Sequence, residues 1–248
     1  MNSNLINEKL ENLFDEWKER MKKNGDMNFT KDGILRKNGI SDTELIETWI
    51  ASSKRIMFLL KDQNQEGGKW NEDIRDWLTT NENTSNLGSK FIKNIAYILW
   101  GLSKADENND WWYNEVTMHI EEVKEFFNSQ PFAMVECKKQ PGGGKLDNKV
   151  LVEHLNIYKD LLEREIEIMR PNMIVCTNHH IYGTVLNMNL FPKKEVVSVK
   201  GHQGVSFHIT TGTLIFCSYH PSDRKSPNEI SEGVMWHYRA FLKSIYNL

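Results

Sequence analysis

Three polar segments that follow short apolar runs hold the residues best suited to chemistry. Lys61-Asp62-Gln63-Asn64 follows the apolar run 56–60, and the basic, glycine-rich segment 138–145 follows the run 132–137. Ser218-Tyr219-His220-Pro221-Ser222 follows the run 213–217. A carboxylate and an imidazole are side chains that exchange protons or stabilise developing charge in hydrolytic reactions. Asp62 and His220 are therefore the first candidates for a reactive site.

Two Cys-x-x-His pairs offer a different chemistry. Cys176 precedes His179, and Cys217 precedes His220, with each pair at the end of an apolar run. Four such ligands could form a tetrahedral zinc site, which would make His220 a ligand instead of a catalyst. Cysteines at strand ends are commonly buried small hydrophobes, so we interpret these as structural and expect no metal.

Strands and helices alternate along the chain, which predicts a three-layer α/β/α sandwich with a mostly parallel sheet. Residues 1–50 are expected to form a helical extension packed on the core, and residues 51–248 the α/β domain. Ligands bind such sheets outside the carboxyl ends of the strands, where all three polar segments are expected. The predicted strands are 56–60, 132–137, 172–176, 196–199, 206–209 and 213–217. The predicted helices are 5–21, one after the Ser41 cap, 87–102, 113–127, 151–169, 181–188 and one after Pro227.

Composition excludes several classes of protein. The 248 residues include 8 Trp, 11 Phe and 7 Tyr, too many large apolar groups for a disordered chain. No apolar run approaches the roughly 20 residues of a membrane helix, no secretory signal is evident, and three cysteines form no disulfide framework. We therefore expect a cytoplasmic monomer with no membrane partner. The net charge of −3 means that a nucleic-acid partner would need a local basic patch.

From about Ile56 to Ser222 the chain resembles the uracil-DNA glycosylase superfamily. Leu60-Lys61-Asp62-Gln63 stands where that family has a Gly-x-Asp/Asn-Pro turn, although Gly and Pro are absent and a shift of one residue would put Gln63 at the position of the acid. Glu136 stands where the family has a pyrimidine-reading Asn. A long helix ending before Pro171 and the tripeptide His220-Pro221-Ser222 match the later family elements in order. The resemblance implies a glycosylase-like α/β fold.

The resemblance also implies that Asp62 and His220 are catalytic. Cleavage of a base from deoxyribose leaves positive charge on the sugar, which a carboxylate stabilises while it positions the attacking water, as in glycoside hydrolysis. His220 would donate a hydrogen bond to the base oxygen where negative charge develops. The product would be an abasic site in an uncut strand, so the enzyme would be a monofunctional hydrolase. No cofactor is expected, since three cysteines cannot supply the four ligands of the iron–sulfur cluster found in some family members.

A glycosylase must hold a flipped-out base in a pocket and grip the phosphates around it. Trp70 or Trp77 is the candidate stacking ring, and backbone amides beside Gln63 and Ser222 would assist the reaction. The expected partner is DNA, duplex or single-stranded. The predicted substrate-binding residues are Gln63, Asn64, Trp70, Trp77, Glu136 and Ser222, and the predicted DNA-binding residues are Lys138, Lys139, Lys145, Arg224 and Lys225.

Glu136 sets the expected choice of base. An ionised Glu only accepts hydrogen bonds, whereas an Asn both donates and accepts. Glu136 would therefore repel a carbonyl edge and favour an amino group. The hypothesis that follows is a modified or damaged pyrimidine, such as a modified cytosine, in DNA repair or in defence against foreign modified DNA.

Simpler interpretations stand beside these. Asp62 could be a turn or cap residue, His220 could bind a backbone carbonyl, Glu136 could pair with a neighbouring lysine, and the lysine cluster could be a solvated loop. The tryptophans could be core residues. Two other functions remain open: an inactive glycosylase-like module that binds DNA or protein, and a hydrolase of free nucleosides or nucleotides.

Overall fold

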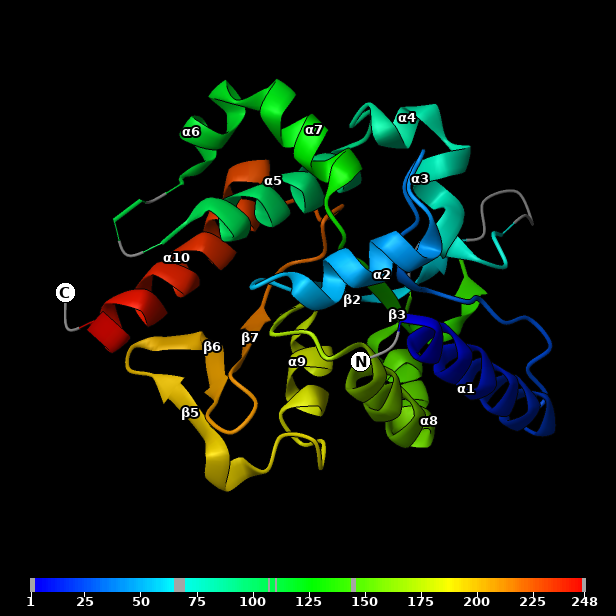
Figure 1. The fold of residues 1–248 in the computed structure, drawn as a ribbon. Helices are drawn as coiled ribbons and strands as arrows, with labels where there is room; N and C mark the ends of the chain where they lie inside the picture. The colour runs from blue at the N-terminus through cyan, green and yellow to red at the C-terminus, as the bar shows by residue number, and fades with distance from the viewer. Residues whose placement is uncertain (1–2, 65–69, 107, 110, 144–145, 247–248) are drawn as a thin grey trace.

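Strands β1 to β7 form one mixed sheet in the computed structural model, which describes residues 3–64, 70–106, 108–109, 111–143 and 146–246 (Figure 1). The strand order is β1-β3-β2-β4-β7-β6-β5. The parallel core of the predicted sheet is confirmed for β3, β2, β4 and β7, while β1 at one edge and β6 and β5 at the other are antiparallel. The strands are Gly33–Ile34 (β1), Ile56–Asn64 (β2), Ala133–Gly142 (β3), Met173–Cys176 (β4), Val196–Val199 (β5), His202–His208 (β6) and Thr213–Cys217 (β7).

Helices cover both faces of the sheet, which confirms the layered α/β architecture (Figure 1). Neighbouring residues of a central strand serve different cores, because successive side chains point to opposite faces. Met57 and Leu59 join the core under α1, α2, α8 and α9. Phe58 and Leu60 join the core under α5, α6, α7 and α10. Burial on both sides explains why the run 56–60 is continuously apolar.

Most predicted helices are present with slightly different ends. Ser41 caps α2, and its Oγ accepts the Glu44 N–H at 3.2 Å. In the described part of the chain, no helix has both the length and the apolar character to cross a membrane. The helices are Ser3–Lys23 (α1), Asp42–Ala51 (α2), Trp77–Thr80 (α3), Glu82–Ser85 (α4), Lys90–Lys104 (α5), Tyr113–Met118 (α6), Ile120–Ser129 (α7), Asn148–Met169 (α8), His179–Val185 (α9) and Pro227–Tyr246 (α10), with 3-10 turns Ile74–Asp76 (η2) and Lys193–Glu195 (η3).

Two predicted boundaries are wrong in a way that affects the site. The segments 61–64 and 138–142 were expected to be loops, but they continue β2 and β3 as strand. Asp62 and Lys138 are register partners on these neighbouring parallel strands, so opposite charges face each other where the apolar runs stop. The helix predicted over 113–127 is also divided, because the chain turns at His119 between α6 and α7.

The N-terminal segment is joined to the core in two ways. The buried face of α1 lies in the same apolar core as α8, and β1 pairs with β3 at the edge of the sheet. The predicted division at residue 50 stays a prediction, but this segment contributes a strand as well as helices.

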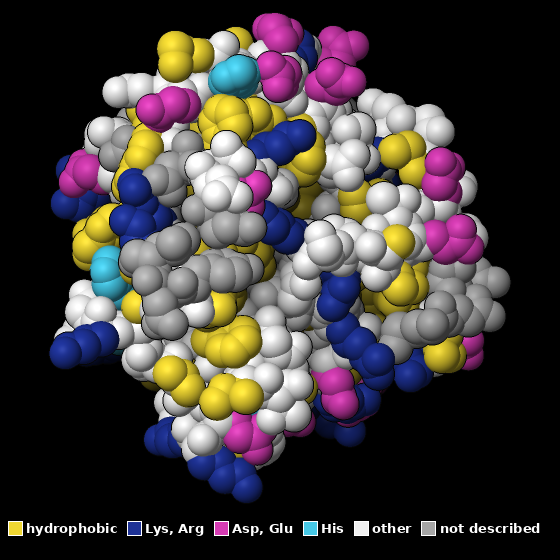
Figure 2. All heavy atoms as spheres, turned by 60° about the vertical axis from the view of Figure 1, so that its left-hand side comes forward, with side chains coloured by type: hydrophobic (Ala, Val, Ile, Leu, Met, Phe, Trp, Pro, Cys, Tyr) yellow, Lys and Arg dark blue, Asp and Glu magenta, His cyan; other side chains and the backbone are white. Residues whose placement is uncertain are grey.

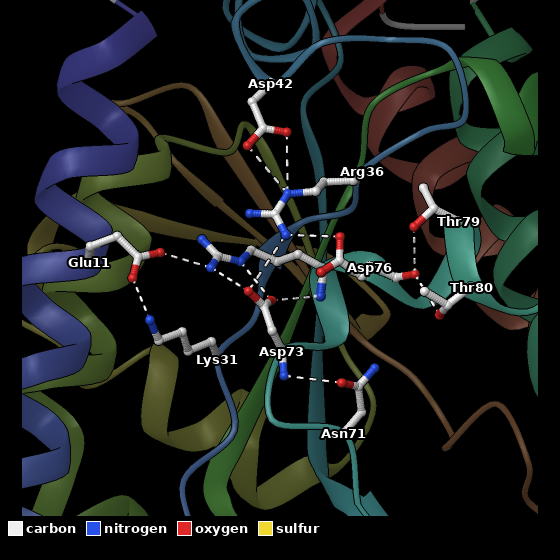
Figure 3. Close-up of polar contacts among 10 residues, drawn as sticks. Glu11, Lys31, Arg36, Asp42, Asn71, Asp73, Asp76, Thr79 and Thr80 are labelled. Carbon is white, nitrogen blue, oxygen red and sulfur yellow. Dashed lines mark hydrogen bonds and ion pairs between the residues drawn. The ribbon is translucent and has the colours of Figure 1, made fainter.

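An ion-pair network connects α1 and the segment 31–36 to the polypeptide that follows β2 (Figure 3). Arg75, whose side chain is 7% exposed, pairs with Glu11 at 2.8 Å and with Asp73 at 2.5 Å. Arg36 pairs with Asp42 at 3.2 Å and with Asp76 at 2.9 Å. The network therefore fastens the segment 73–76, which leads into α3, to α1 and to the segment 31–36.

The connections of the parallel strands reverse direction at β2. The chain passes from β2 to β3 on one side and then crosses to β4 on the other side. Such a reversal opens a crevice outside the carboxyl ends of the strands, and ligands of open α/β sheets bind there. The fold therefore places the candidate site beside the ends of β2 and β4.

Candidate functional site

A cavity of about 570 Å³ lies at this edge of the sheet, beside the carboxyl ends of β2 and β3. Asp62, in β2, and His220, in the segment after β7, both line it. The structure therefore brings the predicted carboxylate and imidazole to one cavity, although 157 residues separate them in sequence. The other lining residues are Lys61, Asn64, Gly143, Leu146, Ser222, Asp223 and Arg224.

Asp62 is held against β3. Its side chain is 8% exposed, and its Oδ2 lies 3.4 Å from the Lys138 ammonium. Burial raises the pKa of the Asp62 carboxyl, while the charge and the hydrogen bond of Lys138 oppose that rise. The backbone of Gly142 passes so close that a Cβ atom there would overlap Oδ2. This carboxylate is tightly confined, and its ionisation is favoured chiefly by Lys138 and also by the charge of Lys61.

His220 is a neutral imidazole with a defined tautomer. The Ser222 backbone N–H donates to Nδ1 at 3.3 Å, and the Ser222 hydroxyl lies 2.8 Å from the same atom. Because Nδ1 accepts the amide hydrogen, the ring proton is on Nε2. Burial lowers the pKa of His220 to about 4, the Lys61 charge adds to this, and Asp223 opposes it. At neutral pH the ring is an uncharged hydrogen-bond donor through Nε2–H.

Helix α5 positions the segment that carries His220. The Asn94 side chain, which is buried, donates to the Pro221 carbonyl at 2.6 Å, and Lys90 donates to the carbonyls of Asp223 and Lys225. The Phe91 ring lies 5.6 Å from the His220 ring. Sequence reasoning missed Phe91 as a site residue, because its place on an apolar helix face is equally typical of a core residue.

The two predicted stacking tryptophans do not line this cavity. Trp77 lies in α3 with its ring 5.7 Å from the Phe91 ring, so Phe91 separates it from His220. Trp70 is half-buried, and its Nε1 is buried with no partner among the described residues. Phe91, instead of either tryptophan, is the ring beside His220.

Gln63 and Asn64 have different environments. The Gln63 Oε1 accepts from the Thr30 hydroxyl at 3.4 Å and from the Asn71 N–H at 3.1 Å. This side chain fastens neighbouring segments and lies outside the cavity lining, so its predicted substrate contact is not supported. Asn64 is exposed and lines the cavity, as does Ser222.

Glu136 is buried beneath the site and is not an exposed acceptor. It is 5% exposed, its N–H donates to Asp32 at 2.6 Å, and its Oε2 has no partner among the described residues. Burial raises the pKa of Glu136 well above 4.5, and the charges of Asp32 and Asp62 raise it further. Glu136 is also absent from the cavity lining, so the structure gives it no contact with a bound base, and the prediction that it selects an amino group is not supported.

Two of the predicted DNA-binding lysines are buried. The Lys139 side chain is 0% exposed and lies 2.6 Å from Asp32 and 2.8 Å from Glu165, so it cannot reach a phosphate. The Lys138 side chain is 5% exposed and contacts Asp62 and the Gln140 carbonyl. Both predictions are wrong because β3 continues into the sheet, where these side chains face carboxylates.

The remaining predicted cations differ in position. Arg224 is exposed and lines the cavity. Lys225 is exposed beside it, pairs with Glu229 at 3.3 Å, and lies over the Tyr219 ring. Lys145 lies outside the described residues. Lys61, which sequence reasoning did not single out, lines the cavity and acts on the pKa of His220.

A second cavity of about 480 Å³ adjoins the first. Lys61, His220 and Asp223 line both cavities and form the wall between them. The second cavity extends past the ends of β4 and β7 to α10, where Gly233 and His237 line it. The crevice therefore has two connected compartments with His220 between them.

The two Cys-x-x-His pairs lie near each other, because Cys176 and Cys217 are register partners on β4 and β7 and because His179 and His220 line the second cavity. Cys176 is fully buried in the core, while His179 is exposed at the start of α9. Among the residues that the structure describes, no group of three or more His, Cys, Asp or Glu side chains is arranged to hold a metal ion.

Comparison with known proteins adds no relative. No family model matches this sequence, and no curated protein matches it.

Proposed function

We propose that this protein is a DNA glycosylase, which hydrolyses the N-glycosidic bond of a flipped-out pyrimidine and leaves an abasic site. The observation that carries the proposal is the shared cavity of Asp62 and His220, a carboxylate and a neutral imidazole at the carboxyl end of a parallel sheet. The motif order that resembles the uracil-DNA glycosylase superfamily supports the same assignment. A divergent member of that superfamily is the proposed identity.

In the proposed reaction, Asp62 acts on the water and the sugar, and His220 acts on the departing base. Water adds to C1′, the C1′–N electron pair leaves with the base, and Asp62 orients the water and accepts its proton. The Asp62 carboxylate also stabilises the positive charge that develops on the sugar. His220 donates its Nε2–H to the base oxygen, where negative charge develops. A neutral donor is sufficient for this role, which agrees with the lowered pKa of His220.

The neighbouring residues support these two groups. Lys138 favours the ionised form of Asp62, and Ser222 fixes the His220 tautomer. Phe91 lies beside the imidazole, and Arg224 at the cavity offers a cation for a phosphate. Because Glu136 is buried and does not line the cavity, it no longer narrows the substrate to an amino-bearing base. The proposed substrates are modified or damaged pyrimidines in general, and repair and defence are both compatible settings.

The experiment measures abasic sites by alkaline strand cleavage. Single-stranded and duplex oligonucleotides carry uracil, hydroxymethylcytosine or a bulkier modified cytosine. Wild-type protein should cleave at one of these bases, and Asp62→Asn and His220→Ala should each lose most of that activity. Asn64→Ala, at an exposed residue of the same cavity, should lower the activity less than these two variants. Ile157→Ala, on α8 and outside the cavity, is the control.

Three results contradict the proposal. The first is excision that survives both Asp62→Asn and His220→Ala. The second is cleavage of free nucleosides without cleavage in DNA, which would indicate a small-molecule hydrolase. The third is salt-sensitive DNA binding with no abasic product from any substrate, which would indicate a binding module.

A further inference from the structure

A groove lined by aromatic and cationic side chains lies next to the crevice. Its volume is about 400 Å³. Rings and cations make up most of its wall, and no carboxylate occurs among its described lining residues. We call it the Trp236 groove, formed by Trp112, His202, Trp236, Arg239, Ala240 and Lys243.

One ring of this groove, that of Trp236, has a large exposed surface. Trp236 is 48% exposed although its ring centroid lies 4.1 Å from that of His202. The Arg239 guanidinium lies 5.4 Å from the centre of the Trp112 ring, which is a cation–π contact. Lys243 is exposed one helical turn beyond Arg239. Rings and positive charges therefore lie beside one another in the groove.

The Trp236 groove continues from the second compartment of the crevice along α10. His237 lines that compartment, and its ring lies 5.8 Å from His202 and 5.1 Å from Trp236. Gly233 lines the compartment one turn earlier on the same helix. Figure 2 turns toward the viewer the side on which α10 ends and β5 and β6 lie, and on this face apolar and cationic side chains lie beside one another. One chain of ligand could thus occupy both places.

We propose that the Trp236 groove binds single-stranded DNA that is continuous with the nucleotide held in the crevice. Exposed rings stack on unpaired bases regardless of sequence, and nearby cations follow the phosphates. In a duplex the bases are stacked on one another, so the rings of the groove have no free base to contact. The continuity with the crevice rests on the proposed function, whereas the preference for single strands rests on the groove itself.

The test measures the binding of a fluorescent thymidine-only oligonucleotide to the full chain by anisotropy, in the Asp62→Asn background. Trp236→Ala should weaken binding by about 5-fold to 100-fold, the range that stacking of one base gives. Trp236→Phe should retain most of the affinity, since a ring remains. Lys243→Gln should weaken binding less and should reduce the slope of log affinity against log salt by about 0.7. The matched duplex should bind more weakly than the single strand.

Ile157→Ala and Lys9→Gln, on α8 and α1 across the sheet, are the matched controls and should bind like the parent. Equal loss with Trp236→Phe and Trp236→Ala, unchanged binding with Trp236→Ala, or equal affinity for duplex and single strand would each overturn the inference. The two proposals fail separately. Absence of abasic sites with Trp236-dependent strand binding rejects only the glycosylase, and excision with Trp236-independent binding rejects only the groove.

Discussion

Lys138 Nζ lies 3.4 Å from Asp62 Oδ2, and the two residues are register partners on the parallel strands β3 and β2. Both side chains are almost completely buried, at 5% and 8% exposure. Burial disfavours the ionised carboxylate, and the lysine offsets this cost. Lys138, which was predicted to bind a phosphate, therefore holds the Asp62 carboxylate in place and favours its ionised form.

Replacing Lys138 should move the acid limb of activity to higher pH. In the Lys138→Met variant the pKa of Asp62 should rise further, because only the weaker effect of the Lys61 charge then opposes burial. Activity that needs ionised Asp62 is lost as pH falls through that raised pKa, so the loss should begin at a higher pH than in wild type. The measurement is the profile of kcat/KM against pH, with the exposed Lys149→Met as control. An identical acid limb in both variants would contradict the relationship.

Two neighbouring glycines test the confinement of Asp62. A Cβ atom at Gly142 would overlap Asp62 Oδ2, whereas a Cβ at Gly143 would meet no atom within 4 Å. Gly142→Ala should therefore displace the carboxylate and lower kcat by about 100-fold, the cost of a misplacement of roughly 1 Å. Gly143→Ala leaves Asp62 in place and should lower kcat far less, although Gly143 also lines the cavity. Equal rates in the two variants would show that the exact position of Asp62 does not matter.

The central fold was predictable because its signal is local. Continuous apolar runs identify strands buried on both faces, and the run 56–60 in β2 is an example. The extension of β2 and β3 was not predictable from polar residues such as Asp62 and Lys138. Asp62 and Lys138 stabilise each other although they lie 76 positions apart in sequence. The amino-acid sequence alone does not reveal that the two side chains are paired.

The site was predictable only in part, for a related reason. Asp62 and His220 share a cavity because the carboxyl ends of parallel strands meet at one edge of the sheet. Lys139 was wrongly assigned to DNA because sequence shows its charge but not its burial. Its partners Asp32 and Glu165 lie 107 and 26 residues away. Charge near a motif therefore indicates a binding role only when the side chain is also exposed.

The ion-pair network around Arg75, whose partners Glu11 and Asp73 are labelled in Figure 3, should contribute to stability in a pH-dependent way. Arg75→Met should lower the free energy of unfolding by about 2 kcal/mol, less than the roughly 3–5 kcal/mol of a fully buried pair, because its partner Glu11 is 41% exposed. Arg164→Met, which breaks a surface pair with Glu16, should cost about 0–1 kcal/mol. Urea unfolding at pH 7 measures both changes. Equal losses of unfolding free energy in Arg75→Met and Arg164→Met would mean that the burial of Arg75 does not strengthen its ion pairs.

The charges of the same network indicate how the stability difference between wild type and Arg75→Met changes at acid pH. Burial opposes ionisation of Asp73, but the hydrogen bonds and charge of Arg75 outweigh it and lower the pKa of Asp73 from 3.8. The pKa of Glu11 is lowered in the same way, by Lys31 and Arg75 against burial. A lowered pKa in the folded state gives stability that is present above the unfolded pKa and is lost as pH falls through the folded one. The difference in the free energy of unfolding between wild type and Arg75→Met should therefore become smaller below about pH 4. A difference that stays constant with pH would contradict this.

Two charged neighbours of His220 should shift its pKa in opposite directions. Burial first and the Lys61 charge second lower its pKa from 6.5 to about 4, whereas Asp223 raises it. Lys61→Gln should therefore raise the pKa of His220, and Asp223→Asn should lower it further. Because folding favours the neutral ring, the unfolded chain binds the proton more readily, and stability should fall as pH drops from 6.5 towards 4. Proton NMR of the imidazole measures the pKa, with Lys225→Gln as a control for charge, since Lys225 is exposed and pairs with Glu229. A wild-type value near 6.5, or shifts of the same sign in Lys61→Gln and Asp223→Asn, would contradict the account of burial and these two charges as the causes of the lowered pKa.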